Sequence, residues 1–94
     1  MFILRIDHSV QDFASWKRSF DSDPVGRERS GVRRYRISRP IDDANFVTVD
    51  LEFDTVSQAQ TLLAALHAVW SRVEGTVIMK PQGRVIEAVE IKEL

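Results

Sequence analysis

The stretch FVTVDLEF, residues 46–53, gives the clearest indication of the fold, because apolar and polar side chains alternate along most of its length. Successive side chains of a β-strand point to opposite faces, so this alternation predicts a strand with one buried face. The apolar set is Val47, Val49, Leu51 and Phe53, and the polar set is Thr48, Asp50 and Glu52. The apolar set is expected to lie against helices, and the polar set to face the other side of the sheet.

A second strand is predicted just before this one, over residues 32–39. The connecting segment PIDDAN, residues 40–45, is rich in turn-forming residues, so the two strands are expected to form an antiparallel hairpin. In that hairpin Tyr35 and Ile37 should join the helix side. Arg34 and Arg36 should then lie on the opposite face, near Asp50 and Glu52, where an arginine can bind a carboxylate through two hydrogen bonds.

The first third of the chain reads as a strand followed by a helix. Apolar residues alternate over residues 2–7, and the pattern SVQD, residues 9–12, predicts a helix start with Ser9 as the N-cap. Phe13, Trp16 and Phe20 then share one helical face. The pair Asp23-Pro24 is expected to end the helix, because the residue before a proline avoids the helical conformation.

The second half of the chain predicts a long helix and a last strand. TVSQ, residues 55–58, fits a capping box with Thr55 as N-cap and the Gln58 side chain reaching back to it. An apolar stripe continues to Val73, and Gly75 is expected to stop the helix. Residues 76–80 fit a strand or a loop, residues 81–83 (PQG) a turn, and residues 84–91 the last strand.

The order strand, helix, strand, strand, helix, strand is the split βαβ arrangement. It predicts one ferredoxin-like α+β domain over residues 1–94, with a four-stranded antiparallel sheet and two helices on one face. The other face must meet water or a partner. From the residues alone, a solvated face with weak ion pairs and a sheet-to-sheet interface both remain open.

Composition excludes several classes of function. The net charge of −1 and the absence of a nucleic-acid motif argue against a nucleic-acid or membrane-surface role. The apolar N-terminal run is too short for a signal peptide or a membrane span, so a cytoplasmic location is the default expectation. There is no cysteine, and the pair Asp42-Asp43 has no spaced partners, so no metal site is predicted.

Three segments resemble the dimeric α+β barrel superfamily, close to its antibiotic biosynthesis monooxygenase-like group. They are DHSVQDFASWKRSFD (7–21), GVRRYR (31–36) and VTVDLEF (47–53). The resemblance implies a homodimer formed through the sheet face, with a pocket between helices and sheet in each subunit. The superfamily includes cofactor-free monooxygenases acting on quinols and polyketide aromatics, haem-degrading enzymes, polyketide cyclases and proteins of no known activity.

The candidate site residues each have a structural alternative. His8, at the end of the first strand, could be a general base, or simply a polar residue at a strand–helix junction. Trp16 and Tyr35 could line an aromatic pocket, or belong to the core. His67 and Trp70, one turn apart on the long helix, are candidate lining residues with the same alternative.

Haem degradation is disfavoured, because the haem-degrading members use an Asn, a Trp and a His as iron ligand. Here Asp7 stands where the Asn is wanted and Ser57 where the Trp is wanted. Trp70 follows His67 instead of preceding it by several turns. The arginines between residues 33 and 39 could form an anion site. Pairing with Asp50, Glu52 and Glu87 is the simpler interpretation.

Two functional hypotheses therefore stand side by side. In the first, the protein is a monooxygenase-like enzyme acting on an aromatic or quinol-like molecule without a bound cofactor. His8 would be its base, and Trp16, Tyr35, His67 and Trp70 its lining. In the second, it is a non-catalytic dimeric module that binds a ligand or serves as a scaffold.

Overall fold

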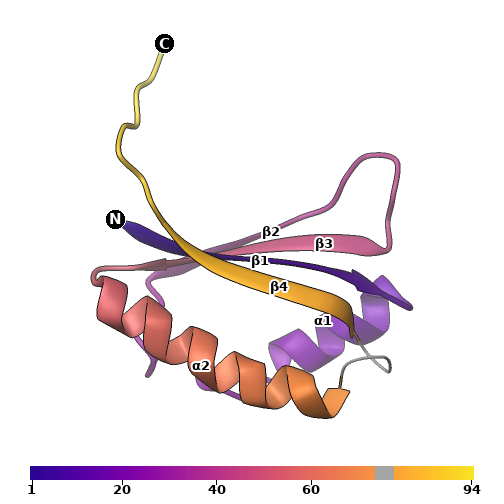
Figure 1. Cartoon of the computed structure of the whole chain (residues 1–94). Coiled ribbons are helices and arrows are strands. Elements are labelled where there is room, and N and C mark those ends of the chain that lie inside the picture. The colour runs from indigo at the N-terminus through magenta and orange to yellow at the C-terminus, as the bar shows by residue number, and fades with distance from the viewer. Residues whose placement is uncertain (74–77) are drawn as a thin grey trace.

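The computed structural model describes residues 1–73 and 78–94, and it has the split βαβ order expected from the sequence (Figure 1). The elements are β1 (Phe2–Val10), α1 (Phe13–Asp21), β2 (Arg34–Ser38), β3 (Phe46–Phe53), α2 (Val56–Val73) and β4 (Ile78–Glu87). None of the helices in the described part of the chain has the length and apolar character needed to cross a membrane.

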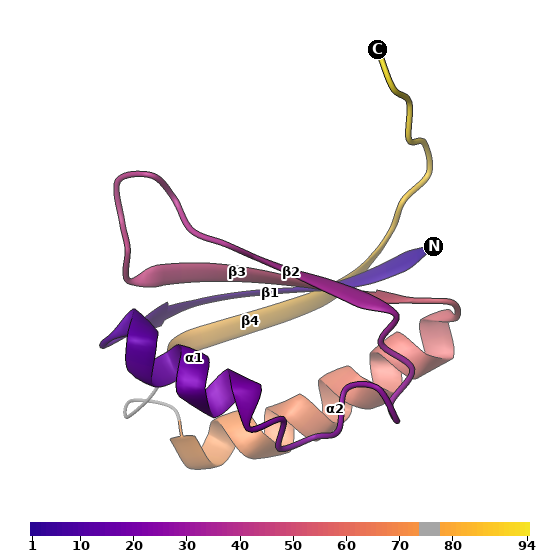
Figure 2. The ribbon, with the colours of Figure 1, turned by 180° about the vertical axis from the view of Figure 1, so that it is seen from behind.

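The four strands form one antiparallel sheet in the order β2-β3-β1-β4. Both helices cover the same face of this sheet, and the views in Figures 1 and 2 leave the opposite face bare. The hairpin loop after β2 and the chain after β4 both project on that bare side. The ferredoxin-like α+β fold predicted from the sequence is therefore confirmed.

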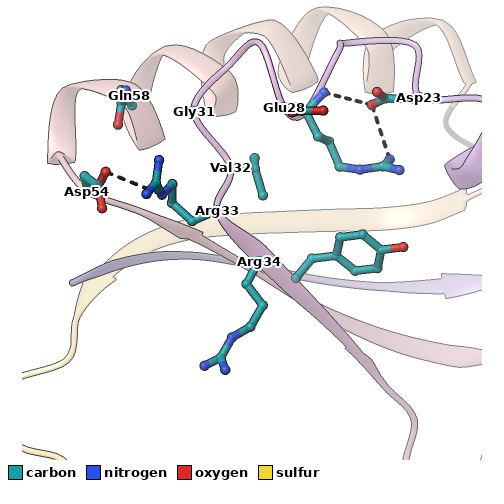
Figure 3. A pocket seen from close by; sticks show the side chains of 10 residues that line it. Asp23, Glu28, Gly31, Val32, Arg33, Arg34, Asp54 and Gln58 are labelled. Carbon is teal, nitrogen blue, oxygen red and sulfur yellow. Dashed lines mark hydrogen bonds and ion pairs between the residues drawn. The ribbon is translucent and has the colours of Figure 1, made fainter.

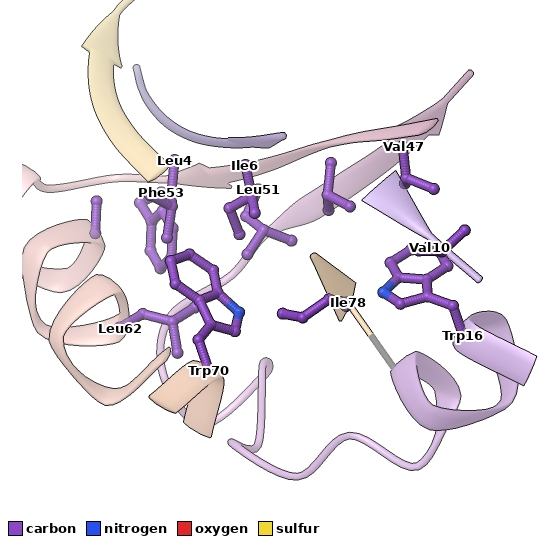
Figure 4. Close-up of a cluster of buried hydrophobic side chains, with 12 residues drawn as sticks. Leu4, Ile6, Val10, Trp16, Val47, Leu51, Phe53, Leu62, Trp70 and Ile78 are labelled. Carbon is purple, nitrogen blue, oxygen red and sulfur yellow. The ribbon is translucent and has the colours of Figure 1, made fainter. Parts of the chain in front are cut away.

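The core lies between the sheet and the two helices (Figure 4). The apolar set of β3 is buried against the helices, as predicted, with Val47 and Phe53 almost wholly inaccessible. Leu4 of β1 and Leu62 of α2 complete the centre of this cluster. Burying such side chains is the main favourable contribution to folding, at roughly 25 cal/mol per Å² of apolar surface.

The bare face of the sheet carries two ion pairs, one of them as expected. Arg34 of β2 donates to Glu52 of β3, at 2.8 Å from Nη2 to Oε2. Asp50 does not pair with Arg36, its neighbour in register on β2. Both of its oxygens accept instead from Arg5 of β1, at 2.8 and 2.9 Å, because β1 flanks β3 on its other side.

The predicted start of the first helix is wrong. Strand β1 continues through Ser9 to Val10, whose side chain is buried in the core and whose N–H donates to the Asn45 carbonyl at 2.8 Å. The N-cap is Asp12, whose carboxylate accepts from the Ser15 N–H at 2.9 Å and from its hydroxyl at 2.8 Å. Burying Val10 from the strand outweighs the local capping preference of Ser9.

The predicted start of the second helix holds in part. The Thr55 hydroxyl accepts from the Gln58 N–H at 3.2 Å, which is the N-cap bond expected of a capping box. The Gln58 side chain lies against Gly31, so close that a Cβ on that glycine would stand 2.7 Å from its amide. The predicted helix stop at Gly75 lies outside the described residues.

The end of the chain differs most from expectation. Pro81, Gln82 and Gly83 do not form a turn but belong to β4, and Gly83 pairs with Ile6. The proline is tolerated because β4 is an edge strand and the register shifts opposite residues 7–9. The strand ends at Glu87, so Val89 and Ile91, predicted to lie within it, are exposed.

Candidate functional site

A cavity of about 260 Å³ lies between the helices and the sheet. Its walls come from β1, β3, both helices, the segment after α1 and the start of β4. Most of the wall is apolar. The aromatic and polar side chains in it include His8, Trp16, Phe20, Arg27 and Trp70. A concave, mostly apolar cavity with a few polar groups is the usual form of a small-molecule site.

His8 reaches the cavity because even-numbered residues of β1 point toward the helices, as Leu4, Ile6 and Val10 do. The side chain is only 4% exposed. Burial lowers the pKa of this imidazole below its ordinary 6.5, and the Ser9 carbonyl and Asp7 only partly oppose that effect. At neutral pH the ring is therefore uncharged.

The hydrogen bond of His8 also selects its tautomer. Nδ1 lies 3.3 Å from the Ser9 carbonyl oxygen, which can only accept. Nδ1 therefore carries the proton, and Nε2 keeps its lone pair. A neutral imidazole with a free Nε2 is the form needed in a general base.

Aromatic rings form two sides of the cavity. Trp16 of α1 lies with its ring centroid 5.4 Å from that of His8 and 5.3 Å from that of Phe20. Trp70 of α2 closes the other side, and Figure 4 shows both indoles pointing toward the sheet with Ile78 between them. Such rings offer flat apolar surfaces against which an aromatic ligand can pack.

The structure brings together three of the five candidate residues and separates the other two. His8, Trp16 and Trp70 all line the cavity. Tyr35 is 44% exposed and lines a surface groove instead. It meets the cavity wall through Phe20, at 5.1 Å between ring centroids, and through Arg27, whose guanidinium carbon lies 5.2 Å from the centroid of the Tyr35 ring. His67 is exposed on α2, beside Trp70 at 5.4 Å between centroids.

Sequence reasoning missed Arg27, which lies in the loop after α1 and lines the cavity. Its Nη1 donates to the Phe20 carbonyl at 2.7 Å and lies 3.5 Å from a carboxylate oxygen of Asp23. Its guanidinium carbon stands 3.8 Å from the centroid of the Phe20 ring. The sequence offered only an arginine-rich loop here, without any spacing that predicts a buried guanidinium.

The surface groove that Tyr35 lines is larger, with a volume of about 790 Å³, and lies beside the start of β2 (Figure 3). Arg33 points into it toward Asp54, at 3.6 Å, whereas Arg34 points to the bare side of the sheet. The groove is lined by both acidic residues and arginines in equal number, so its net charge is close to zero. Within residues 1–73 and 78–94 no cluster of three metal-ligating side chains exists.

Comparison with known proteins adds a fold but no family. The sequence matches no family model, and no curated protein is similar to it in sequence. The fold is a ferredoxin-like α+β domain of the kind found in structures named as antibiotic biosynthesis monooxygenases.

Three solved structures illustrate that likeness. SnoaB, a cofactor-independent oxygenase from Streptomyces nogalater, superposes with a TM-score of 0.73 at 16% identity, covering 96% of this chain and 94% of that one. A Deinococcus radiodurans protein provisionally named an antibiotic biosynthesis monooxygenase gives 0.74 at 16% identity, covering 100% and 98%. A dimeric ferredoxin-like protein from an uncultured marine organism gives 0.65 at 11% identity, covering 99% and 100%. At these identities the likeness is one of fold.

Proposed function

We propose that the protein is a homodimeric, cofactor-independent monooxygenase that acts on a small aromatic or quinol-like molecule held in the helix–sheet cavity. The observation that carries this proposal is the meeting of a neutral buried histidine with two tryptophans around one apolar cavity. The fold shared with SnoaB, which is named a cofactor-independent oxygenase, supports the same reaction class.

The size of the cavity narrows the substrate. An engineered apolar cavity of about 150 Å³ holds one benzene molecule. The space here, about 260 Å³, suits a compound of one or two rings. A haem macrocycle is much larger, so the volume agrees with the sequence in disfavouring haem degradation.

The chemistry needs one base and dioxygen. Nε2 of His8 would take a proton from an acidic C–H or O–H group of the substrate, leaving an electron-rich anion that can reduce O₂ directly. For a ring CH₂ group the balance is CH₂ plus O₂ giving C=O plus H₂O. One oxygen atom enters the ring, and the other leaves as water. The apolar walls would keep competing water away from the anion.

The homodimer would form through the bare face of the sheet. Ile3 and Ile86 lie side by side there, and the carboxylates of Asp50 and Glu52 are already paired with arginines. A two-fold axis would bring the same patch of each subunit together. The marine relative in fold is named a dimeric protein, which supports this arrangement.

The test combines binding with turnover. Thermal unfolding is measured with a panel of one- and two-ring phenols and quinols, and hits are assayed for O₂ uptake and for ¹⁸O incorporation from ¹⁸O₂. A ligand present at 100 times its dissociation constant should stabilise the native state by about 2.7 kcal/mol. His8→Asn should abolish O₂ uptake, whereas His67→Asn, which changes the exposed histidine, should leave it intact.

Two results would contradict the proposal. If His8→Asn takes up O₂ at the full wild-type rate, His8 is not the base of the reaction. Saturable binding with no O₂ uptake across the panel would favour the non-catalytic ligand-binding module instead.

A further inference from the structure

Arg27 is the one formally charged residue among the described residues that line the cavity. The other polar members are hydroxyls and the neutral imidazole of His8. Its side chain is only 15% exposed. A buried cation is costly unless an anion or several acceptors face it, so its position in an apolar wall calls for a partner.

The partners that Arg27 has within the described residues use only part of the guanidinium. Both polar contacts, to the Phe20 carbonyl and to Asp23, are made by Nη1. Nε and Nη2 keep their N–H groups for another acceptor, since a guanidinium carries five donors. Arg27 lines the open groove as well as the cavity, whereas Asp23 lines the groove alone.

The aromatic ring under the guanidinium indicates how a ligand would be oriented. Arg27 covers the Phe20 ring at 3.8 Å, and Phe20 continues into Trp16, whose ring centroid is 5.3 Å away. A flat ligand packed along these rings would place a substituent at its edge near the guanidinium. Arginine recognises carboxylates and other oxyanions through paired hydrogen bonds, and these strengthen where water is excluded.

We propose that Arg27 selects an anionic ligand: a one- or two-ring aromatic compound whose ionised oxygen, a carboxylate or a phenolate, binds the guanidinium. This assignment rests on the proposed function, because it takes the helix–sheet cavity to be the ligand site. It specifies further that the ligand is negatively charged and that Arg27 is the residue that binds the charged group.

The test uses two probes that differ only in charge, 2-naphthoate and 2-naphthamide, titrated calorimetrically into the full chain. The wild-type protein should bind the carboxylate at least about tenfold more tightly, as expected for hydrogen bonds to a charged group. Arg27→Met keeps the apolar stem, and it should bring the two affinities within about twofold of each other by weakening naphthoate alone. Arg27→Lys should keep part of the preference.

Arg33→Met is the matched control, because Arg33 lines the open groove but not the cavity. It should leave the preference for naphthoate unchanged. Equal binding of both probes by the wild-type protein overturns the role of Arg27 while leaving the cavity as a ligand site. A preference lost in Arg33→Met would move the anion to the groove, whether or not Arg27→Met keeps it, because Arg27 lines both spaces. Binding of neither probe would overturn the ligand cavity, and this assignment with it.

If Arg27→Met fails to fold, as seen by circular dichroism, the wild-type comparison and Arg27→Lys still decide the matter. The wild-type protein must discriminate between the probes for the assignment to stand.

Discussion

The rings of His8 and Trp16 lie 5.4 Å apart between centroids and are tilted by 59°, although one belongs to a strand and the other to a helix. The indole packs against the imidazole as a tilted aromatic pair. This contact joins the first strand of the sheet to the first helix at the cavity wall. The histidine is 4% exposed, and this burial lowers its pKa.

The lowered pKa of His8 makes stability depend on pH. The imidazole has a pKa of 6.5 in the unfolded chain and a lower one in the native protein. Between these values the unfolded state binds more protons, so the free energy of unfolding decreases as the pH falls below 6.5. We expect denaturant unfolding between about pH 7.5 and pH 5.5 to show a larger loss for the wild-type protein than for His8→Gln.

The other histidine serves as the control for this experiment. His67→Gln should retain the pH dependence of the wild-type protein. An identical decrease in His8→Gln would mean that other groups cause it.

The two carboxylates Asp50 and Asp54 should differ in their contributions to stability. Asp50 is 9% exposed and accepts two hydrogen bonds from Arg5, which is 38% exposed. Asp54 and its partner Arg33 are 69% and 70% exposed and 3.6 Å apart. Asp50→Ala should lower the free energy of unfolding by roughly 2 kcal/mol, and Asp54→Ala by less than about 1 kcal/mol. Urea titrations at one protein concentration measure both, and equal losses would contradict the distinction.

Gly83 controls the shape of the cavity. A Cβ at this position would stand 2.7 Å from Cδ1 of Leu63 and 3.2 Å from Cη2 of Trp70. The Leu63 methyl can move, but the indole is rigid and forms part of the cavity wall. Gly83→Ala should cost about 1–3 kcal/mol of stability by overpacking, and it should weaken 2-naphthamide binding measured by calorimetry. Gln82→Ala, one residue earlier on the same strand, should leave that affinity unchanged, and an unaltered affinity in Gly83→Ala would refute this role.

A charged residue placed in the bare face of the sheet should prevent dimerisation through that face. Ile86 pairs with Ile3 across β1 and β4 on that face. A lysine there would bury an unpaired charge in the proposed interface, so Ile86→Lys should sediment as a folded monomer, whereas the wild-type protein should sediment as a dimer. Val56→Lys makes the same change at an exposed position of α2 and should remain dimeric. A wild-type monomer, or a dimeric Ile86→Lys, would exclude this interface.

The sequence predicted the elements whose pattern is purely local. Strand β3 was predicted with its observed bounds because each of its faces meets one environment. The helix start predicted at Ser9 was wrong, because the burial of Val10 depends on core contacts that the local sequence does not reveal. Gly83 was taken for a turn residue, although its role is to let α2 approach β4 closely.

The candidate site was predictable only in part for the same reason. His8, Trp16 and Trp70 stand out as residue types, and they meet in the cavity. The partner of Asp50 depends on which strand flanks β3, and the position of Arg27 depends on how its loop folds back onto Phe20. Neither has a signature in the spacing of residues along the chain.

The strand order has a consequence for how the protein folds. Strands β2 and β3 are joined by a short loop and can pair early, as Ser38 and Thr48 do in the hairpin. Strand β1 pairs with two segments that are far from it along the chain, since Leu4 pairs with Leu51 on one side and Val85 on the other. Contacts between such distant segments close large loops and form slowly. Because the cavity is lined by His8 of β1, Val49 of β3 and Ile78 of β4, it is complete only when these distant segments have all paired.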